Sequence, residues 1–236
     1  MMSADRSGDR IEVALRASRL LAGIDEATAA TLAAGSVRRR FVRGTRLWKA
    51  GEDASWMALI TSGLVKIVQP DTHGAIVAIF GAHESFGELA VVEGGAYTAD
   101  AVATTREVDV ICIDAVAVRA ALSSRPMFSL AMNHALVAHG RALQEKVRIM
   151  SAGCVERRLA MLLGHLVERF GDELEDGSCV VPVVLTRAEL ASLVGATIET
   201  TIRTMSRWRK EGFVSTLHEG FVVHRPAHLE ELRSVA

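Results

Sequence analysis

The spacing of apolar positions changes along the chain and predicts a helix, then a run of strands, then further helices. Over residues 11–34 leucine and isoleucine recur at nearly helical intervals, which predicts a helix. Between residues 41 and 113 short apolar or alternating runs are separated by Gly, Asp, Ser and Pro, with turn signals at 62–63, 70–74 and 93–95. Short strands punctuated in this way predict an antiparallel barrel or sandwich.

Residues 126–150 predict a long helix, because a proline occupies its first turn and no other proline interrupts it. One side of this helix carries apolar or small residues at intervals of four and three: Leu136, Gly140, Leu143, Val147 and Met150. That spacing is typical of two helices packed as a coiled coil. The seam spans only about two heptads, so a helix packed against its own domain explains it as well as a dimer does.

Residues 155–170 predict a second amphipathic helix, which follows a break at 151–153. Its leucines lie on one face, and Gly171 is well placed as its C-cap.

The stretch 185–214 carries the most specific local signals. Thr186 and Glu189 have the spacing of a capping box, which starts a short helix. Gly195 ends that helix and permits the tight turn of a helix-turn-helix. Thr197 is placed to cap a second helix that runs to about residue 210.

A hairpin that turns near Glu219 and Gly220 follows the second helix, in the position of a wing. Ordinary core packing is the alternative explanation for any helix–glycine–helix. Because the cap, the glycine, the basic second helix and the hairpin occur together and in order, the sequence favours DNA binding.

The second helix supplies the candidate reading residues. Met205 and Trp208 would face the core, while Glu199, Thr200 and Arg203 project outward. Arg203 can donate two hydrogen bonds to guanine, and Glu199 can accept one from cytosine, in the major groove. The remaining basic residues are predicted phosphate contacts: Arg187, Arg207, Arg209 and Lys210.

Composition and charge restrict the class of protein but do not identify a function. The net charge is −1, so any DNA-binding surface must be local. The N-terminus has no signal-peptide-like apolar segment, and no apolar run is long enough to span a bilayer. The three cysteines are scattered, which fits a reducing cytoplasm. Because the sequence shows no nucleophile–base set, metal-ligand spacing or P-loop, we do not expect an enzyme.

From about residue 20 to 230 the chain resembles the catabolite activator/fumarate–nitrate regulator (CRP/FNR) family of bacterial transcription factors. Three segments carry the resemblance: GTRLWKAGEDASWMALITSGLVKI (44–67), SFGELAVVEGGAYTADAVA (85–103) and ETTIRTMSRW (199–208). It implies an α+β protein with an N-terminal β-roll of the cyclic-nucleotide-binding type (a jelly roll, 1–125), a long dimerisation helix and hinge (126–152) and a winged helix-turn-helix (153–236). It also implies a homodimer that binds palindromic double-stranded DNA and contacts RNA polymerase.

The resemblance assigns the reading helix in part. Glu199 and Arg203 match the Glu and Arg that read a TGA core in the family, and Thr200 matches the following Thr of the cyclic-AMP type. Ile198 replaces an Arg that such members use on DNA, and Ile202 stands where oxygen-sensing members place a Ser. The half-site outside TGA therefore stays open, and an exposed Ile could touch a thymine methyl.

The implied effector pocket departs further from the family: Gly87, Glu88, Leu89, Thr98, Ala99, Leu143 and Gln144. Glu88 would bond a ribose hydroxyl, although an acid near a helix N-terminus is favourable without a ligand. Thr98 and Ala99 replace the Arg–Ser pair that holds a cyclic phosphate, and Leu143–Gln144 replaces the Thr–Ser pair that contacts adenine. Cyclic AMP is therefore not expected, because the charge-assisted phosphate pair is missing. Arg106 or Arg119 could substitute for the missing Arg, but nothing in the sequence places either in the pocket.

Other members of the family sense different signals. Haem is one alternative, with His83, His134 or His139 as ligand. An iron–sulfur redox sensor is not favoured, because this chain lacks the N-terminal cysteine cluster that would hold the iron–sulfur group. A rival of another class is a cyclic-nucleotide regulatory subunit that acts through protein contacts. Such a subunit would need no reading helix. The effector itself stays unknown.

Overall fold

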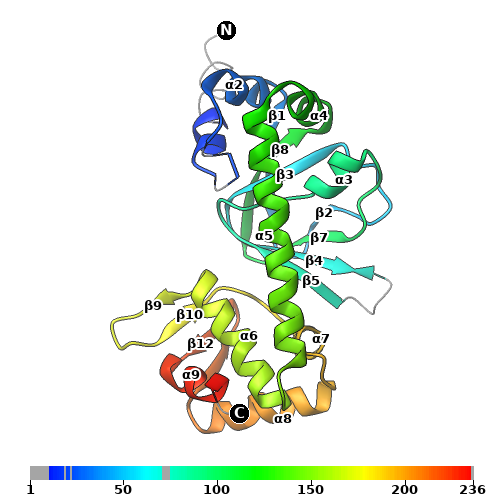
Figure 1. Ribbon diagram of the computed structural model, residues 1–236. Helices are drawn as coiled ribbons and strands as arrows, with labels where there is room; N and C mark the ends of the chain where they lie inside the picture. Colours follow the sequence, from blue (N-terminus) through cyan, green and yellow to red (C-terminus); the bar gives the residue numbers. More distant parts are fainter. Residues whose placement is uncertain (1–10, 19, 22, 71–74, 235–236) are drawn as a thin grey trace. The chain divides into compact units, whose positions relative to one another are not determined.

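The computed structural model describes residues 11–18, 20–21, 23–70 and 75–234 (Figure 1). The chain divides into two compact units, one of residues 1–70 and 78–141 and the other of residues 71–77 and 142–236. Most of the predicted turn at 70–74 lies outside the described residues.

The first unit is built on two four-stranded sheets, with strand orders β1-β8-β3-β6 and β2-β7-β4-β5, although residues 75–77 of β5 are assigned to the second unit. The strands are β1 (Ser36–Val42), β2 (Arg46–Trp48), β3 (Trp56–Ser62), β4 (Val65–Gln69), β5 (Ala75–Phe80), β6 (Ser85–Phe86), β7 (Asp100–Ala103) and β8 (Glu107–Asp114). Neighbouring strands pair antiparallel, as β8 does with β1 and β3. This confirms the predicted β-roll, which begins at Ser36 rather than near residue 41.

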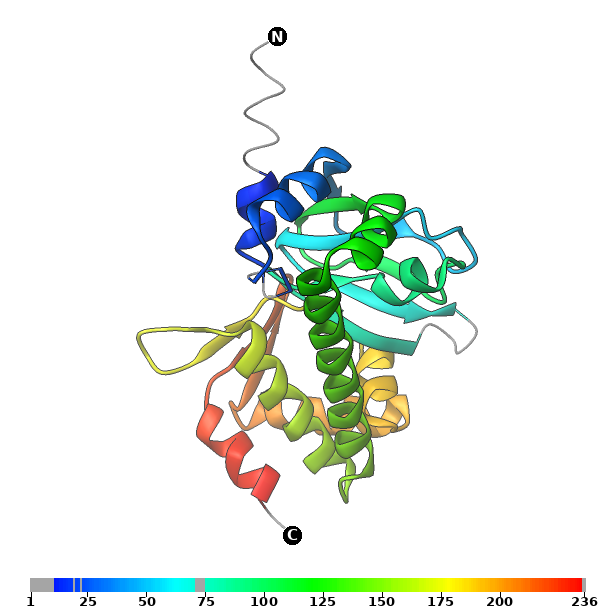
Figure 2. The same ribbon diagram turned by 45° about the horizontal axis from the view of Figure 1, so that its top comes forward.

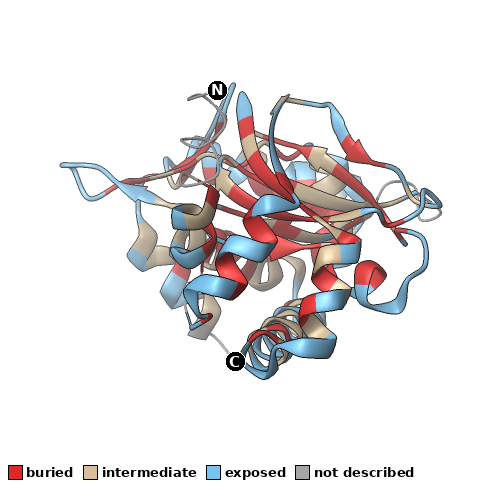
Figure 3. Ribbon diagram, turned by 90° about the horizontal axis from the view of Figure 1, so that it is seen from above, coloured by how far each residue is buried: buried red, intermediate tan, exposed pale blue. Residues whose placement is uncertain are grey.

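The apolar runs of the roll form its core. Met57, Leu59, Val108 and Ile111 are each at most 1% exposed. Consecutive residues of β3 and of β8 are buried, so both strands are covered on both faces, as expected for short apolar runs in the core of a roll. The turn between β3 and β4 needs glycine, because Gly63 has φ +83° and a side chain there would collide with the carbonyl oxygen of Glu107. In Figure 3 the buried positions follow the strands and the inner faces of the helices that cover them.

The prediction of one helix over residues 11–34 is wrong. Residues 11–16 are helical, and a separate helix, α2 (Glu26–Ala34), follows. The Asp25 side chain accepts a hydrogen bond of 2.8 Å from the backbone N–H of Thr28 and so starts the new helix. Residues 19 and 22 of the predicted helix lie outside the described part.

Three more helices belong to this part of the chain: α3 (Glu88–Glu93) lies between β6 and β7, and α4 (Ala115–Ser124) and α5 (Pro126–Ser151) follow β8. The long helix predicted from residue 126 is confirmed as α5, which contributes to both units. Its N-terminal half packs on the roll core through Phe128 and Met132, 1% and 2% exposed. Among the described helices none is both long and apolar enough to cross a membrane.

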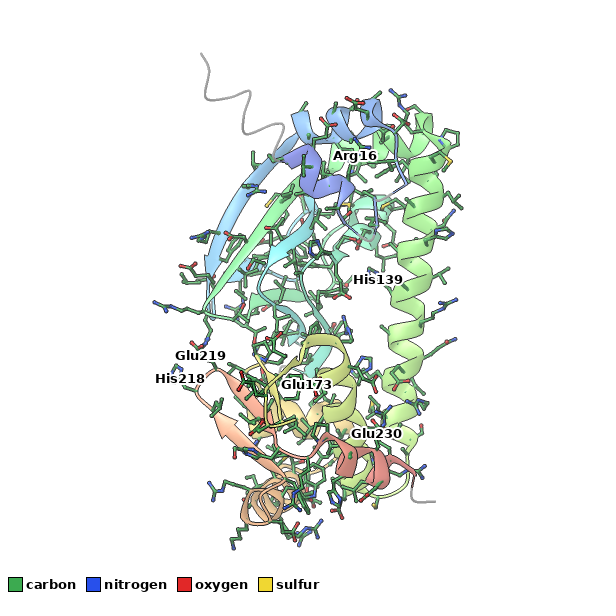
Figure 4. The ribbon with its side chains drawn as sticks, turned by 90° about the vertical axis from the view of Figure 1, so that its left-hand side faces the viewer. Arg16, His139, Glu173, His218, Glu219 and Glu230 are labelled. Carbon is green, nitrogen blue, oxygen red and sulfur yellow. The ribbon has the colours of Figure 1, made fainter. Side chains whose placement is uncertain are left out.

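The second unit contains α6 (Val155–Phe170), β9 (Asp172–Glu173), β10 (Cys179–Val181), α7 (Arg187–Val194), α8 (Ile198–Lys210), β11 (Val214–Leu217), β12 (Gly220–Val223) and α9 (Pro226–Ser234). Its sheet has the order β11-β12-β10-β9, and α6 lies beside it (Figure 2). The predicted hairpin is confirmed as β11–β12, with His218 and Glu219 at its turn (Figure 4). The α6 face predicted to be apolar is buried, including Leu159 and Leu163.

Candidate nucleic-acid interface and sensor site

The rotation of α8 about its axis is fixed by its buried face. Trp208 is fully buried, and its indole Nε1 donates a hydrogen bond of 3.0 Å to Oε1 of Glu156 on α6. Met205, Thr201 and Thr204 are buried on the same face, as predicted for Met205 and Trp208. The residues on the opposite side therefore face outward.

The turn that joins α7 to α8 is built from local hydrogen bonds. The capping box of Thr186 and Glu189 starts α7, and Gly195 ends it with φ +60°, both as predicted. Thr197 caps α8 by accepting a 3.2 Å hydrogen bond from the backbone N–H of Thr200. At each helix start, one backbone N–H that lacks a partner within the helix is thus bonded to the capping threonine.

Arg158 of α6 clamps the same turn and was not predicted. Its Nη1 donates to the carbonyl oxygens of Val194 (3.1 Å) and Gly195 (3.0 Å). Its Nε and Nη2 donate to the carbonyl oxygen of Gly153. Arg158 therefore ties the end of α7 to the segment between α5 and α6, as a positioning residue.

The outward face of α8 carries the predicted reading residues. Glu199 and Arg203 are exposed, and within the described part of the chain neither side chain has a hydrogen-bond or ion-pair partner. Ile198 and Ile202 lie beside them and are each 45% exposed. Glu199 lies in the first turn of α8, where the helix dipole favours an acid.

Two of the predicted phosphate contacts, Arg207 and Arg187, already have partners within the second unit. Arg207 forms an ion pair with Glu156, and Arg187 donates a 2.8 Å hydrogen bond to Thr216 of β11. Burial lowers the pKa of Arg187, and the positive charge of Arg209 lowers it further. The proximity of Arg187 and Arg209 makes a local positive region that suits an anion.

Two segments of the β-roll that carry the family resemblance, 44–67 and 85–103, are joined by one tryptophan. A side chain at Gly87, φ +89°, would lie 3.0 Å from the Trp48 ring. Trp48 also donates a 3.1 Å hydrogen bond to the carbonyl oxygen of Ala99 and stacks on Tyr97, with ring centroids 4.1 Å apart. The segment before α3 and the segment before β7 are therefore held through the same side chain.

Glu88, the first residue of α3, is a buried acid. Its side chain is enclosed, and neither carboxylate oxygen has a hydrogen-bond partner among the described residues. Burial raises the pKa of this carboxyl, which His139 and the nearby Ser85 hydroxyl only partly oppose. Figure 4 shows His139 on the roll-facing side of α5, where its ring lies edge-on to Phe80 at 5.3 Å.

Comparison with known proteins gives two matching domain families, the cyclic nucleotide-binding domain over residues 38–125 and the Crp-like helix-turn-helix domain over residues 157–232. A Mycobacterium tuberculosis protein described as a CRP-like cAMP-activated global transcriptional regulator is 31% identical over 176 residues, 74% of this chain and 78% of that protein. The chain belongs to the CRP/FNR family. It is a transcription regulator with a sensing domain of the cyclic-nucleotide-binding type and a helix-turn-helix DNA-binding domain.

Other members of the CRP/FNR family show how far the likeness extends. The anaerobic regulatory protein of Bacillus subtilis is 26% identical, and the match covers 82% of each chain. The structure of FixK2 from Bradyrhizobium japonicum has a TM-score of 0.70 at 17% identity and covers 85% of this chain and 98% of that one. At that identity the structural likeness shows the fold alone.

The remaining predicted residues of this CRP/FNR regulator are more scattered. Leu89 and Thr98 are exposed and Ala99 is buried, while Leu143 and Gln144 are exposed on the part of α5 in the second unit. Of the predicted coiled-coil seam, Leu143, Val147 and Met150 are 58%, 56% and 39% exposed, Gly140 is exposed and Leu136 is half-buried. His83 and His134 are exposed. Within the described residues, no cluster of three or more His, Cys, Asp or Glu side chains is placed to hold a metal ion.

The buried Glu88 carboxyl predicts a pH-dependent stability. Because its pKa is raised on folding, the native state binds the proton more tightly than the unfolded state. Its contribution is thus favourable below the unfolded pKa of about 4.3 and is lost as pH rises through the folded pKa, by at most about 1.4 kcal/mol per pH unit. Glu88→Gln should remove this slope in ligand-free protein.

Urea denaturation at pH 4.5, 6 and 7.5 measures the free energy of unfolding of wild type and Glu88→Gln. The variant should gain on the wild type as pH rises. Glu93→Gln, in the exposed last residue of α3, is the matched control and should follow the wild type. A difference between wild type and Glu88→Gln that is the same at every pH contradicts the inferred burial of an unpaired carboxyl.

Proposed function

We propose that this regulator binds a palindromic DNA site with TGA-type half-sites as a homodimer and acts on transcription through RNA polymerase. One observation carries the proposal: α8 directs Glu199 and Arg203 outward with no partner in the described chain. An unpaired guanidinium can bond guanine O6 and N7 together, and an unpaired carboxylate can accept from cytosine N4. Their spacing of one helical turn puts both on the same groove edge.

Arg187 and Arg209 support phosphate contacts beside the reading helix. Burial and the charge of Arg209 lower the pKa of Arg187, and a phosphate bound between the two arginines would relieve their repulsion. Arg207 already pairs with Glu156, and we propose that its exposed guanidinium shares a phosphate with that acid. The Thr197 and Thr200 hydroxyls bond each other at the start of α8, where phosphate oxygens are favourable acceptors.

The exposed seam of α5 supports the homodimer. Leu143 and Val147 present large apolar surfaces that the described chain leaves uncovered. A second copy of α5 would cover them, and Gly140, which has open space around it, would let the two helices approach closely. We take residues 126–152 as the dimerisation helix and hinge between the sensor (1–125) and the DNA-binding domain (153–236). A two-fold dimer matches a palindromic site.

We propose that the sensor responds to a signal other than cyclic AMP. The mycobacterial relative is described as cAMP-activated, but Thr98 and Ala99 stand here in place of the phosphate-binding Arg and Ser. Without an Arg at position 98, a cyclic phosphate would lack its charge-assisted pair. Haem is one candidate signal, with His139 as its ligand, because this imidazole lies on the roll-facing side of α5 beside Phe80.

We propose that the protein is a cytoplasmic regulator and not an enzyme. Two of its relatives are described as a transcriptional regulator and a probable transcriptional activator. A regulatory subunit that acts only through protein contacts would not need the outward Glu199 and Arg203. RNA polymerase is the partner that a DNA-bound activator needs.

Leu143→Asp should convert the dimer to a monomer. The substitution places two unpaired carboxylates in the symmetric seam, at a cost on the order of several kcal/mol of association. Sedimentation or light scattering measures the mass. Val116→Asp, at a valine of α4 that is somewhat more exposed than Leu143, is the control and should stay dimeric. A monomeric wild type, or an unchanged dimer for Leu143→Asp, contradicts the seam.

Cyclic AMP should bind weakly or not at all. Isothermal calorimetry at millimolar nucleotide decides this, with Thr98→Arg/Ala99→Ser as the variant expected to gain affinity because it restores a charge-assisted phosphate pair. A low-micromolar dissociation constant for the wild type would show that another cation serves the phosphate.

Arg203→Ala should lose about 1–3 kcal/mol of binding per half-site and relax the preference for guanine at one base pair. Selection from random duplexes gives the site, and titration of wild type and variant against all four base pairs at that position gives the preference. Arg209→Ala is the matched control: as a phosphate contact it should weaken every sequence alike and flatten the salt dependence. Enrichment of a motif without TGA, or guanine preference that survives Arg203→Ala, contradicts the assignment.

A further inference from the structure

The outer face of α8 carries apolar side chains that packing within the described chain does not explain. Ile198 and Ile202 are each 45% exposed. Every other exposed position of this helix is charged: Glu199, Arg203, Arg207, Arg209 and Lys210. Isoleucine is a weaker helix former than Leu, Lys or Glu, so helix stability gives no reason for it here. One exposed apolar residue is ordinary, but two on successive turns of a reading helix indicate a contact.

The two isoleucines form a strip parallel to the polar one. Ile198 and Ile202 lie four residues apart, as do Glu199 and Arg203, so each pair is separated by about 5–6 Å at Cβ. The strips are offset by one residue, about 100° around the helix. Four residues rise about 6 Å, and base pairs are stacked about 3.4 Å apart. Each strip therefore reaches across neighbouring base pairs when α8 lies in the groove.

The chemistry of the major groove leaves an isoleucine one favourable target. Base edges there present hydrogen-bond donors and acceptors, and the only apolar group is the C5-methyl of thymine. An isoleucine placed over the cytosine amino group would bury a donor without a partner, which costs free energy. The same side chain over a thymine buries two apolar groups together. Discrimination therefore has an attractive and a repulsive part.

We propose that Ile198 and Ile202 are specificity-determining residues, which select thymine through its 5-methyl group at base pairs next to those contacted by Glu199 and Arg203. The inference rests on the proposed DNA-binding function and extends it to the part of the half-site that Glu199 and Arg203 do not cover. Because methyl contacts involve no charge, their contribution is independent of salt, unlike that of the phosphate contacts.

Deoxyuridine tests the methyl group alone, since it keeps every hydrogen-bonding group of thymine. The duplex selected by the wild type is synthesised with deoxyuridine at each thymine in turn, in both half-sites, and binding is titrated by fluorescence anisotropy. At the contacted thymines the wild type should bind about fourfold more weakly per half-site, the factor that corresponds to one methyl-sized group leaving an apolar contact. Other thymines should show no change.

The variants Ile198→Ala and Ile202→Ala assign each methyl to its side chain. Each variant should bind the thymine duplex more weakly and lose the penalty for deoxyuridine at its own position only. Leu174→Ala, at an equally exposed leucine outside α8, is the matched control and should keep both the affinity and the full deoxyuridine penalty. Thermal melts confirm that each variant is folded, because substitutions at exposed positions cost little stability.

The two proposals fail in different ways. If a duplex is enriched and Arg203→Ala weakens it, but deoxyuridine has no effect or its penalty survives both isoleucine substitutions, the thymine assignment is overturned and DNA binding stands. If no duplex is enriched, the proposed function and the assignment that rests on it are both overturned.

Discussion

The burial of Trp208 is the constraint on which the DNA-reading surface depends. Its indole is fully buried, and its N–H has a partner in Glu156 of α6, so α8 can adopt one rotation about its axis. Because Trp208 and Met205 lie in the core, the side of α8 that carries Glu199 and Arg203 faces outward. A buried indole without its acceptor would lose a hydrogen bond. The Glu156 carboxylate also accepts from Arg207, so one acid holds both the inner face and the last turn of the helix.

The charge needed for DNA binding is concentrated rather than distributed. The whole chain has a net charge of −1, yet three arginines gather around the end of α8 and the start of α7: Arg187, Arg207 and Arg209. Such an arrangement gives weak attraction for DNA at long range and leaves discrimination to the outward side chains of α8. The sensor shows the opposite distribution. There an unpartnered acid, Glu88, is buried with no described cation bonded to it, which disfavours an anionic ligand unless it brings its own compensation.

Features set by local chemistry could be predicted from the sequence, and those set by distant partners could not. The capping box at Thr186, the turn at Gly195 and the cap at Thr197 follow from neighbouring residues, so the helix-turn-helix was correctly placed. The hydrogen bond from Arg158 to Val194 joins residues 36 positions apart, and no local sequence pattern predicts it. The helix expected over residues 11–34 was wrong because the apolar spacing continued through Asp25, which caps a new helix. The isolation of Glu88 depends on burial by elements far along the chain.

A crystal structure of the protein bound to its selected duplex would show whether the outward face of α8 reads the bases. We expect α8 in the major groove, with the Arg203 guanidinium within hydrogen-bond distance of guanine O6 and N7, and Trp208 still buried against α6. A complex in which another element contacts the bases, or in which α8 has rotated to expose Trp208, would contradict it.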